Sequence, residues 1–181
     1  MQQRGQILAG LAGLCAATPW SAHGAGLPPP ITQATQGQIE CYVPDAEHKT
    51  CHSQVSYILK ADGSIATREQ VVLVRSPAII MSMGYAVTVK ADAVCGYITL
   101  EAVGQATFTI DGASATSEQT AKLRDRLQSN YRPFYNREIC NRNVADGEGL
   151  KSEVSLDGVV QPSIGERVTW VSPSDGYKVQ P

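Results

Sequence analysis

The densest group of side chains capable of metal or nucleophilic chemistry lies in residues 41–52. This segment holds Cys41, His48, Cys51 and His52 together with two acids. Thiolates and imidazoles bind zinc and copper, and a free thiol beside a histidine can act as a nucleophile. The chain contains no Cys-x-x-Cys, so it lacks the spacing of zinc ribbons, haem attachment sites and thioredoxin-like redox sites. We therefore expect no metal or other cofactor and assign no catalytic residue.

Acids and methionines offer two further routes to chemistry. Two carboxylates about 5–10 Å apart can hydrolyse glycosidic bonds. Thioethers bind Cu(I), and Met81 and Met83 share one face of an expected strand. An exported hydrolase that uses a carboxylate pair or the His48/His52 region is therefore one alternative function, and a periplasmic copper-handling protein is another. The candidate acids are Glu40, Asp45, Glu47, Glu69 and Glu101.

Basic and aromatic residues concentrate in residues 122–142, which carry six basic and two acidic side chains in a chain that is acidic elsewhere. Arginine grips carboxylate and phosphate groups, and aromatic rings stack on sugars and cations. The segment therefore predicts contact with an anionic ligand, an envelope component or another protein, although a solvated helix face would explain it too. We do not expect nucleic acid, because the rest of the chain is acidic. The candidate binding residues are Arg124, Arg126, Tyr131, Arg132, Tyr135 and Arg137.

The first 24 residues have the organisation of a signal peptide. Arg4 supplies a positive charge, residues 7–17 are apolar, and Ala22 and Gly24 are small residues before the expected cleavage site. Removal of this segment would also remove Cys15, whose preceding Leu14 does not fit a lipoprotein signal. The sequence therefore predicts a periplasmic or secreted protein.

The remaining cysteines are even in number, which is typical of a disulfide-bonded exported protein. Proximity favours the pairs Cys41–Cys51 and Cys95–Cys140, although three pairings are possible.

Segments rich in Val, Ile, Thr and Tyr predict antiparallel strands in residues 38–43, 54–60, 64–75, 79–90, 94–103 and 106–111, followed by three more after residue 150. A polar loop is expected between Cys140 and Gly149. The predicted fold is α+β, a curved antiparallel sheet with one amphipathic helix packed on it and disulfides across it. An all-β sandwich with a helical excursion is the alternative.

The main helix is expected at about residues 117–131. Thr116 and Gln119 fit a capping box, and Leu123, Leu127 and Tyr131 form one apolar stripe. Five aspartates precede glycine, and this dipeptide suits tight hairpin turns, so we expect these acids to be turn residues.

Composition and length indicate one globular domain. The 181 residues are 43% hydrophobic with a net charge of −2, which excludes a disordered polyelectrolyte. No apolar run reaches the length of about 18 residues that a transmembrane helix needs. Three consecutive prolines mark residues 25–37 as a linker before a single domain at 38–181. We favour an exported, non-enzymatic binding or envelope-associated protein.

This interpretation predicts the chemistry of the exported chain. After export, the protein should begin at or near Ala25, and its four cysteines should react with an alkylating agent only after reduction. Intact-mass measurement before and after reduction gives both results. Four thiols that react without reduction would contradict the disulfide prediction.

Overall fold

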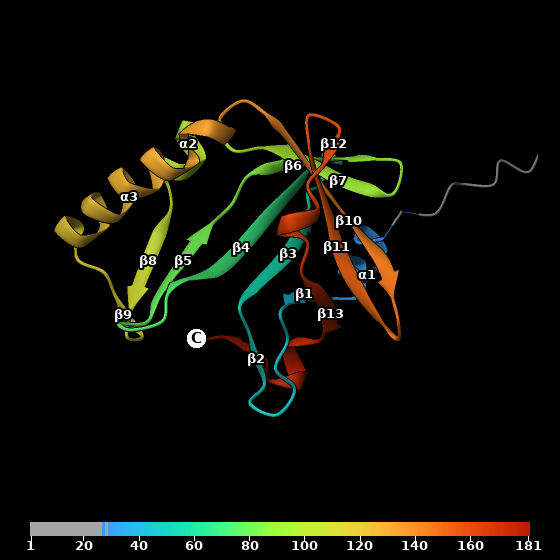
Figure 1. The fold of residues 1–181 in the computed structure, drawn as a ribbon, viewed down its shortest axis with the longest axis horizontal. Coiled ribbons are helices and arrows are strands. Elements are labelled where there is room, and N and C mark those ends of the chain that lie inside the picture. Colours follow the sequence, from blue (N-terminus) through green and yellow to red (C-terminus); the bar gives the residue numbers. More distant parts are fainter. Residues whose placement is uncertain (1–26, 28) are drawn as a thin grey trace, which may run out of the picture.

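The computed structural model describes residue 27 and residues 29–181. The chain forms a mostly antiparallel β structure in which eight strands close into a barrel (Figure 1). Around the barrel the order is β3-β1-β13-β11-β10-β7-β6-β4, and β4 pairs with β3 from Ser53↔Val71 to Leu59↔Ile65 to close the ring. The barrel strands are β1 (Ile39–Tyr42), β3 (Ser53–Leu59), β4 (Ile65–Val74), β6 (Ala86–Lys90), β7 (Ala93–Tyr97), β10 (Glu138–Asp146), β11 (Gly149–Leu156) and β13 (Arg167–Val171).

A smaller sheet leaves the barrel at β4. The first residues of β4 pair with β6, and residues from Glu69 onward pair with β5 (Ile79–Met83). Strands β8 (Thr107–Ile110) and β9 (Ala113–Ser114) extend this second sheet. Two helices cover it: α2 (Leu100–Gly104) and α3 (Ser117–Tyr131), which continues into η1 (Arg132–Phe134) (Figure 1).

The predicted helix is confirmed as α3. Thr116 and Gln119 form the capping box, with the Gln119 N–H donating to the Thr116 side chain at 3.2 Å. Leu127 is buried against Met81, Phe108 and their neighbours, and Leu123 and Tyr131 pack beside it. The apolar stripe therefore joins α3 to the smaller sheet and not to the barrel.

Part of the segment expected as a linker is packed. Helix α1 (Ile31–Thr35) places Ile31, which is 0% exposed, against the inward-facing Tyr57, Val87 and Val94. The signal peptide predicted at residues 1–24 lies outside the described residues. The remaining short elements are β2 (Thr50–Cys51), β12 (Val159–Val160), η2 (Pro162–Ile164), η3 (Pro173–Asp175) and β14 (Lys178–Val179), which pairs with β2.

Both preferred disulfides are confirmed. Cys41–Cys51 ties β1 to β2. Cys95–Cys140 joins directly opposite positions of the paired strands β7 and β10.

The fold class is confirmed only in its coarser form: antiparallel strands, one main helix and two disulfides. The sheet closes into a barrel, which neither the predicted curved sheet nor the alternative sandwich specified. The polar loop expected after Cys140 is wrong, because β10 continues to Asp146 and pairs with β11 throughout. The strand expected at residues 79–90 divides at Gly84 into β5 and β6, and the end of the strand expected at 94–103 is α2.

Hairpin turns explain two of the Asp-Gly aspartates directly. Asp111 and Asp157 have φ of 48° and 50°, and each is followed by a glycine with positive φ. The turn assignment is confirmed for these acids.

Among the residues that the structure describes, no helix is long and apolar enough to span a membrane.

The division between barrel and smaller sheet depends on Gly84. A Cβ at this position would lie 2.8 Å from the backbone oxygen of Thr67 on β4. We expect Gly84→Ala to lower the free energy of unfolding by about 1–3 kcal/mol, because the two backbones would have to separate. Gly104→Ala is the matched control, since open space surrounds that helical position. It should leave stability unchanged or raise it by up to about 1 kcal/mol. Equal effects of the two substitutions in urea unfolding would contradict this account.

Candidate functional site

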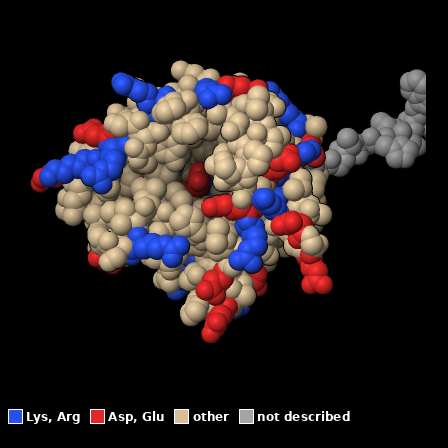
Figure 2. Space-filling model, in the orientation of Figure 1, with Lys and Arg blue, Asp and Glu red and all other residues tan. Residues whose placement is uncertain are grey.

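The barrel encloses a cavity of about 210 Å³. Alternate residues of each strand point inward, because side chains alternate between the two faces of a sheet. Figure 2 shows the mouth of a recess near the centre of this face, with an acidic side chain inside it and both acidic and basic side chains on the surface around it. Its lining residues are Tyr42, Ser53, Val55, Tyr57, Thr67, Glu69, Tyr85, Val87, Val94, Gly96, Ile98, Ile139, Asn141, Ser152, Val154, Ile164 and Glu166.

One inward-facing acid, Glu40 on β1, is fully partnered. Its side chain is 0% exposed. The hydroxyls of Tyr42 and Tyr57 donate to Oε2 at 3.0 and 2.8 Å, and Asn143 Nδ2 donates to Oε1 at 2.6 Å. Burial raises the pKa of Glu40 above 4.5, while the three hydrogen bonds act in the opposite direction. Glu40 therefore acts as the acceptor at the centre of a polar network that fixes the tyrosines.

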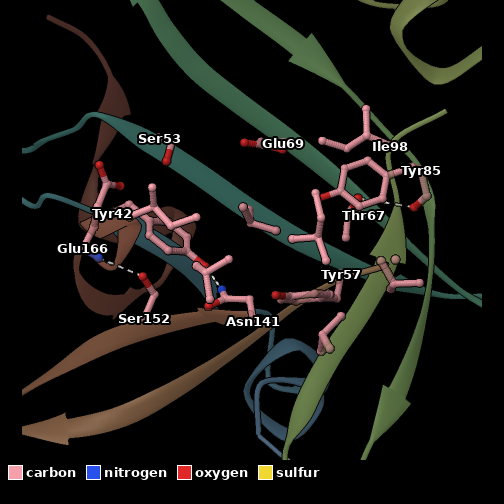
Figure 3. Close-up of a pocket in the computed structure, with 17 residues that line it drawn as sticks. Tyr42, Ser53, Tyr57, Thr67, Glu69, Tyr85, Ile98, Asn141, Ser152 and Glu166 are labelled. Carbon is pink, nitrogen blue, oxygen red and sulfur yellow. Dashed lines mark hydrogen bonds between the residues drawn. The ribbon is translucent and has the colours of Figure 1, made fainter. Parts of the chain in front are cut away.

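The network continues into the cavity wall through Asn141. Its Nδ2 donates to the Tyr42 hydroxyl at 2.7 Å (Figure 3). The Tyr42 hydroxyl in turn donates to Glu40. Asn141 Oδ1 is buried and has no hydrogen-bond partner among the described residues. Asn141, Tyr42 and Glu40 are thus joined by consecutive hydrogen bonds that fix this part of the cavity wall.

A second acid, Glu69 on β4, faces the cavity without such partners. Its side chain makes no hydrogen bond or ion pair with another described residue, and Figure 3 shows it projecting inward from β4. Burial and, second, the nearby charge of Glu166 together raise the pKa of Glu69 from 4.5 to about 7. At neutral pH this carboxyl group therefore lies close to its titration midpoint.

Small hydroxyl side chains complete the polar part of the wall. Ser53 on β3 is only 7% exposed, and its hydroxyl has no hydrogen-bond partner among the described residues. Ser152 lies on β11, four strands from β4 and so on the opposite wall. Its hydroxyl accepts the Glu166 N–H at 2.9 Å (Figure 3). This bond fixes the backbone that carries Glu166.

The arginines predicted to form one binding site make separate contacts within the chain. Arg124 donates through Nε and Nη2 to the backbone oxygen of Ala106 at 3.0 and 2.9 Å, which ties α3 to the end of α2. Arg137 pairs with Asp157 at 2.7 Å. These two guanidinium groups are therefore occupied within the chain.

The other members of the predicted set lie near the end of α3. Arg126 and Arg132 are exposed, and Arg132 and Tyr135 line one shallow surface depression. Tyr131 packs against the smaller sheet, and burial raises its pKa to about 12, with the charge of Glu69 as the next cause. The structure thus brings Arg132 and Tyr135 to one depression, whose lining does not include Arg124 or Arg137.

The positions of the cysteine, histidine and methionine side chains give little support to a copper site or to catalysis by His48. Cys51 is disulfide-bonded, so it cannot serve as the thiol of a Cys–His dyad. His48 is exposed and contacts Asp45, with Nδ1 and Oδ2 2.8 Å apart. Met81 and Met83 are buried in the apolar cluster beneath α3, as ordinary core residues.

Sequence reasoning missed most of the cavity. Glu40 and Glu69 were among five candidate acids, but their convergence on one interior was not anticipated. One sequence signal could have indicated a polar barrel interior, namely polar residues at every second position of a strand. Such pairs are Glu40 and Tyr42, Thr67 and Glu69, and Asn141 and Asn143.

The unpartnered carboxyl group should make stability depend on pH. The folded pKa of Glu69 exceeds 4.5, so the folded chain binds the proton more tightly than the unfolded chain does. The free energy of unfolding should therefore fall by up to about 3 kcal/mol as pH rises from about 4.5 to about 7. Glu69→Gln removes this loss, so it should raise the melting temperature at pH 8 and change it little at pH 4.5. Glu47→Gln, on an exposed loop, is the control and should show no such difference. A Glu69→Gln protein that melts like the wild type at pH 8 would contradict the assignment.

A scan against protein-family models, a search of curated proteins and a search of solved structures each find no match to this chain. The cavity and its chemistry are therefore the basis for assigning a function.

Proposed function

We propose that this protein is an exported binding protein that holds one small molecule inside its β-barrel. The observation that carries the proposal is the cavity of about 210 Å³ inside the barrel, which opens at a mouth on the surface and has a mixed polar and apolar wall (Figure 2). Barrels of eight strands are just wide enough either to be filled by side chains or to hold one small ligand. Because side chains do not fill the interior of this barrel, the cavity supports the binding of a small ligand.

The size of the cavity limits the size of the ligand. A cavity of about 150 Å³ in another protein accommodates benzene. By the same measure, about 210 Å³ suits a molecule of roughly eight to ten non-hydrogen atoms.

The wall has the composition expected of a small-molecule site. Valines and isoleucines provide apolar surface, and a few polar groups converge on the space between them. The Glu40 network holds Tyr42 and Tyr57 in fixed positions before any ligand arrives. Such preorganisation lowers the entropy cost of binding.

Hydrolysis by a carboxylate pair is the second candidate, and Glu69 with Glu166 is the observation in its favour. A carboxyl group with a pKa near 7 suits general acid catalysis. A glycosidic substrate, however, needs space for sugars on both sides of the bond, which exceeds the volume of this cavity. The geometry therefore favours binding over glycan hydrolysis.

Export is supported by the two disulfides, which persist in oxidising compartments. The proposed location is the periplasm or the medium. Arg126 and Arg132 remain candidates for contact with an anionic envelope component or a partner protein, because they are the exposed members of the predicted basic set.

The proposal is tested by blocking the cavity. Val154 lines it from β11, whereas Val160 on β12 is exposed, so Val154→Phe and Val160→Phe form a matched pair. A library of fragments of up to ten non-hydrogen atoms is screened against both by ligand-observed NMR. We expect fragments that bind the wild-type protein and compete with one another, with binding abolished by Val154→Phe and kept by Val160→Phe. If every fragment that binds also binds Val154→Phe, or if none binds, the cavity is not a binding site.

A further inference from the structure

We infer that the ligand of the cavity carries a protonated amino group, which Glu69 and Glu166 bind together with the Ser53 hydroxyl. This inference rests on the proposed binding function and specifies its ligand class.

The first argument is the charge of the wall. Glu69 and Glu166 line the cavity, and none of its lining residues is Lys, Arg or His. Neither carboxylate has a side-chain hydrogen bond or ion pair with any residue that the structure describes. Two acids on the outside of the barrel do form ion pairs: Glu138 pairs with Lys90, and Glu153 pairs with Arg142. These two outer carboxylates are neutralised, whereas no basic side chain among the described residues pairs with Glu69 or Glu166.

The second argument is independent of charge. Ser53 is 93% buried in a wall where most polar groups are bonded, yet its hydroxyl points into the cavity without a partner (Figure 3). Buried polar groups in folded proteins are nearly always hydrogen-bonded, so an exception that faces a cavity indicates a ligand or water. An ammonium group has three donors and no acceptor. The two carboxylates and the Ser53 oxygen supply three acceptors of the required kind.

The remaining surface suits the hydrocarbon part of an organic cation. Val55, Ile98 and Val154 provide apolar contacts, and the Tyr85 ring lines the same space. Aromatic faces attract cations, and the attraction is stronger in a desolvated site. A small aromatic or aliphatic amine therefore satisfies both the charged and the apolar part of the wall.

A metal ion fits these observations less well. Within the described residues, the one group of at least three potential metal-ligating side chains consists of Cys95, Glu138 and Cys140. It lies at the disulfide between β7 and β10 and does not include Glu69. The cavity is also far larger than a bare ion requires.

The electrostatics of Glu69 also favour a cation. Burial and the charge of Glu166 both oppose ionisation of Glu69 and bring its pKa to about 7. A bound cation would offset both effects, because it pairs with the desolvated charge and screens the two carboxylates from each other.

Three probes of similar shape and different charge test the inference: benzylammonium, benzyl alcohol and benzoate. Their dissociation constants are measured by titration calorimetry at pH 8, above the pKa of Glu69, for the wild type, Glu69→Gln and Glu47→Gln. We expect the wild type to bind benzylammonium about tenfold more tightly than benzyl alcohol, and benzoate least tightly. Glu69→Gln should remove most of this tenfold preference for the cation over the alcohol. Glu47→Gln should behave as the wild type.

The outcomes separate this inference from the proposed function. Equal binding of the cation and the alcohol, with both abolished by Val154→Phe, would overturn the cation inference and leave the binding site in place. If Glu69→Gln keeps the preference for benzylammonium, the cation inference is likewise overturned and the binding site remains. The cation inference is also overturned if Mg²⁺ or Zn²⁺ displaces benzylammonium and binds more tightly than it does. Absence of Val154-dependent binding by all three probes would overturn both proposals. A melting curve of each variant confirms that it is folded.

Discussion

Closure of the sheet by the pairing of β3 with β4 is the constraint on which the rest of the structure depends. Seven consecutive residue pairs convert eight strands into a ring, and every second side chain of each strand is then enclosed. Enclosure removes water from polar groups, which costs free energy unless another group replaces it. Glu40 shows the compensated case, because two phenols and one amide supply the hydrogen bonds that water would otherwise make. The position of Tyr42 and Tyr57 follows from the need to satisfy this one carboxyl group.

In the cavity this compensation is incomplete. Glu69, Glu166 and Ser53 face it without side-chain partners among the described residues, although donors are present in the network around Glu40 nearby. A stable fold can retain a few such groups, but each one reduces the free energy of unfolding. Local departures from good packing and hydrogen bonding concentrate at functional sites, where a ligand completes them. In the proposed binding function, the free-energy cost of burying these unpartnered groups would become a source of affinity for a matching ligand.

Local features were predictable from the sequence, whereas the closed interior was not. The α3 helix depends on residues within one or two turns, such as Thr116 with Gln119, and the short-range cysteine pair is favoured by proximity. Barrel closure requires β1 to pair with β13, whose residues are more than 100 positions away, and no local pattern encodes that choice. Strand β10 was mistaken for a loop because Asn141 and Asn143 occupy its inward positions. An interior built around a carboxyl network uses polar residues where an apolar core would show the alternation that identifies a strand.

The charge clusters along the sequence and the charge clusters in the folded chain indicate different candidate binding sites. The basic residues of 122–142 form the strongest cluster along the chain, yet Arg124 binds a backbone oxygen and Arg137 binds Asp157. These contacts hold α3 and the start of β10, so much of the positive charge stabilises the frame around the barrel. Glu69 and Glu166 are 97 residues apart and form no cluster in the sequence, but the barrel brings them to one cavity from which Lys, Arg and His are absent. An unpaired buried charge can therefore be recognised only after the topology is known. Whether a carboxylate has a cationic partner depends on which side chains surround it in the fold, and its neighbours in the sequence do not reveal this.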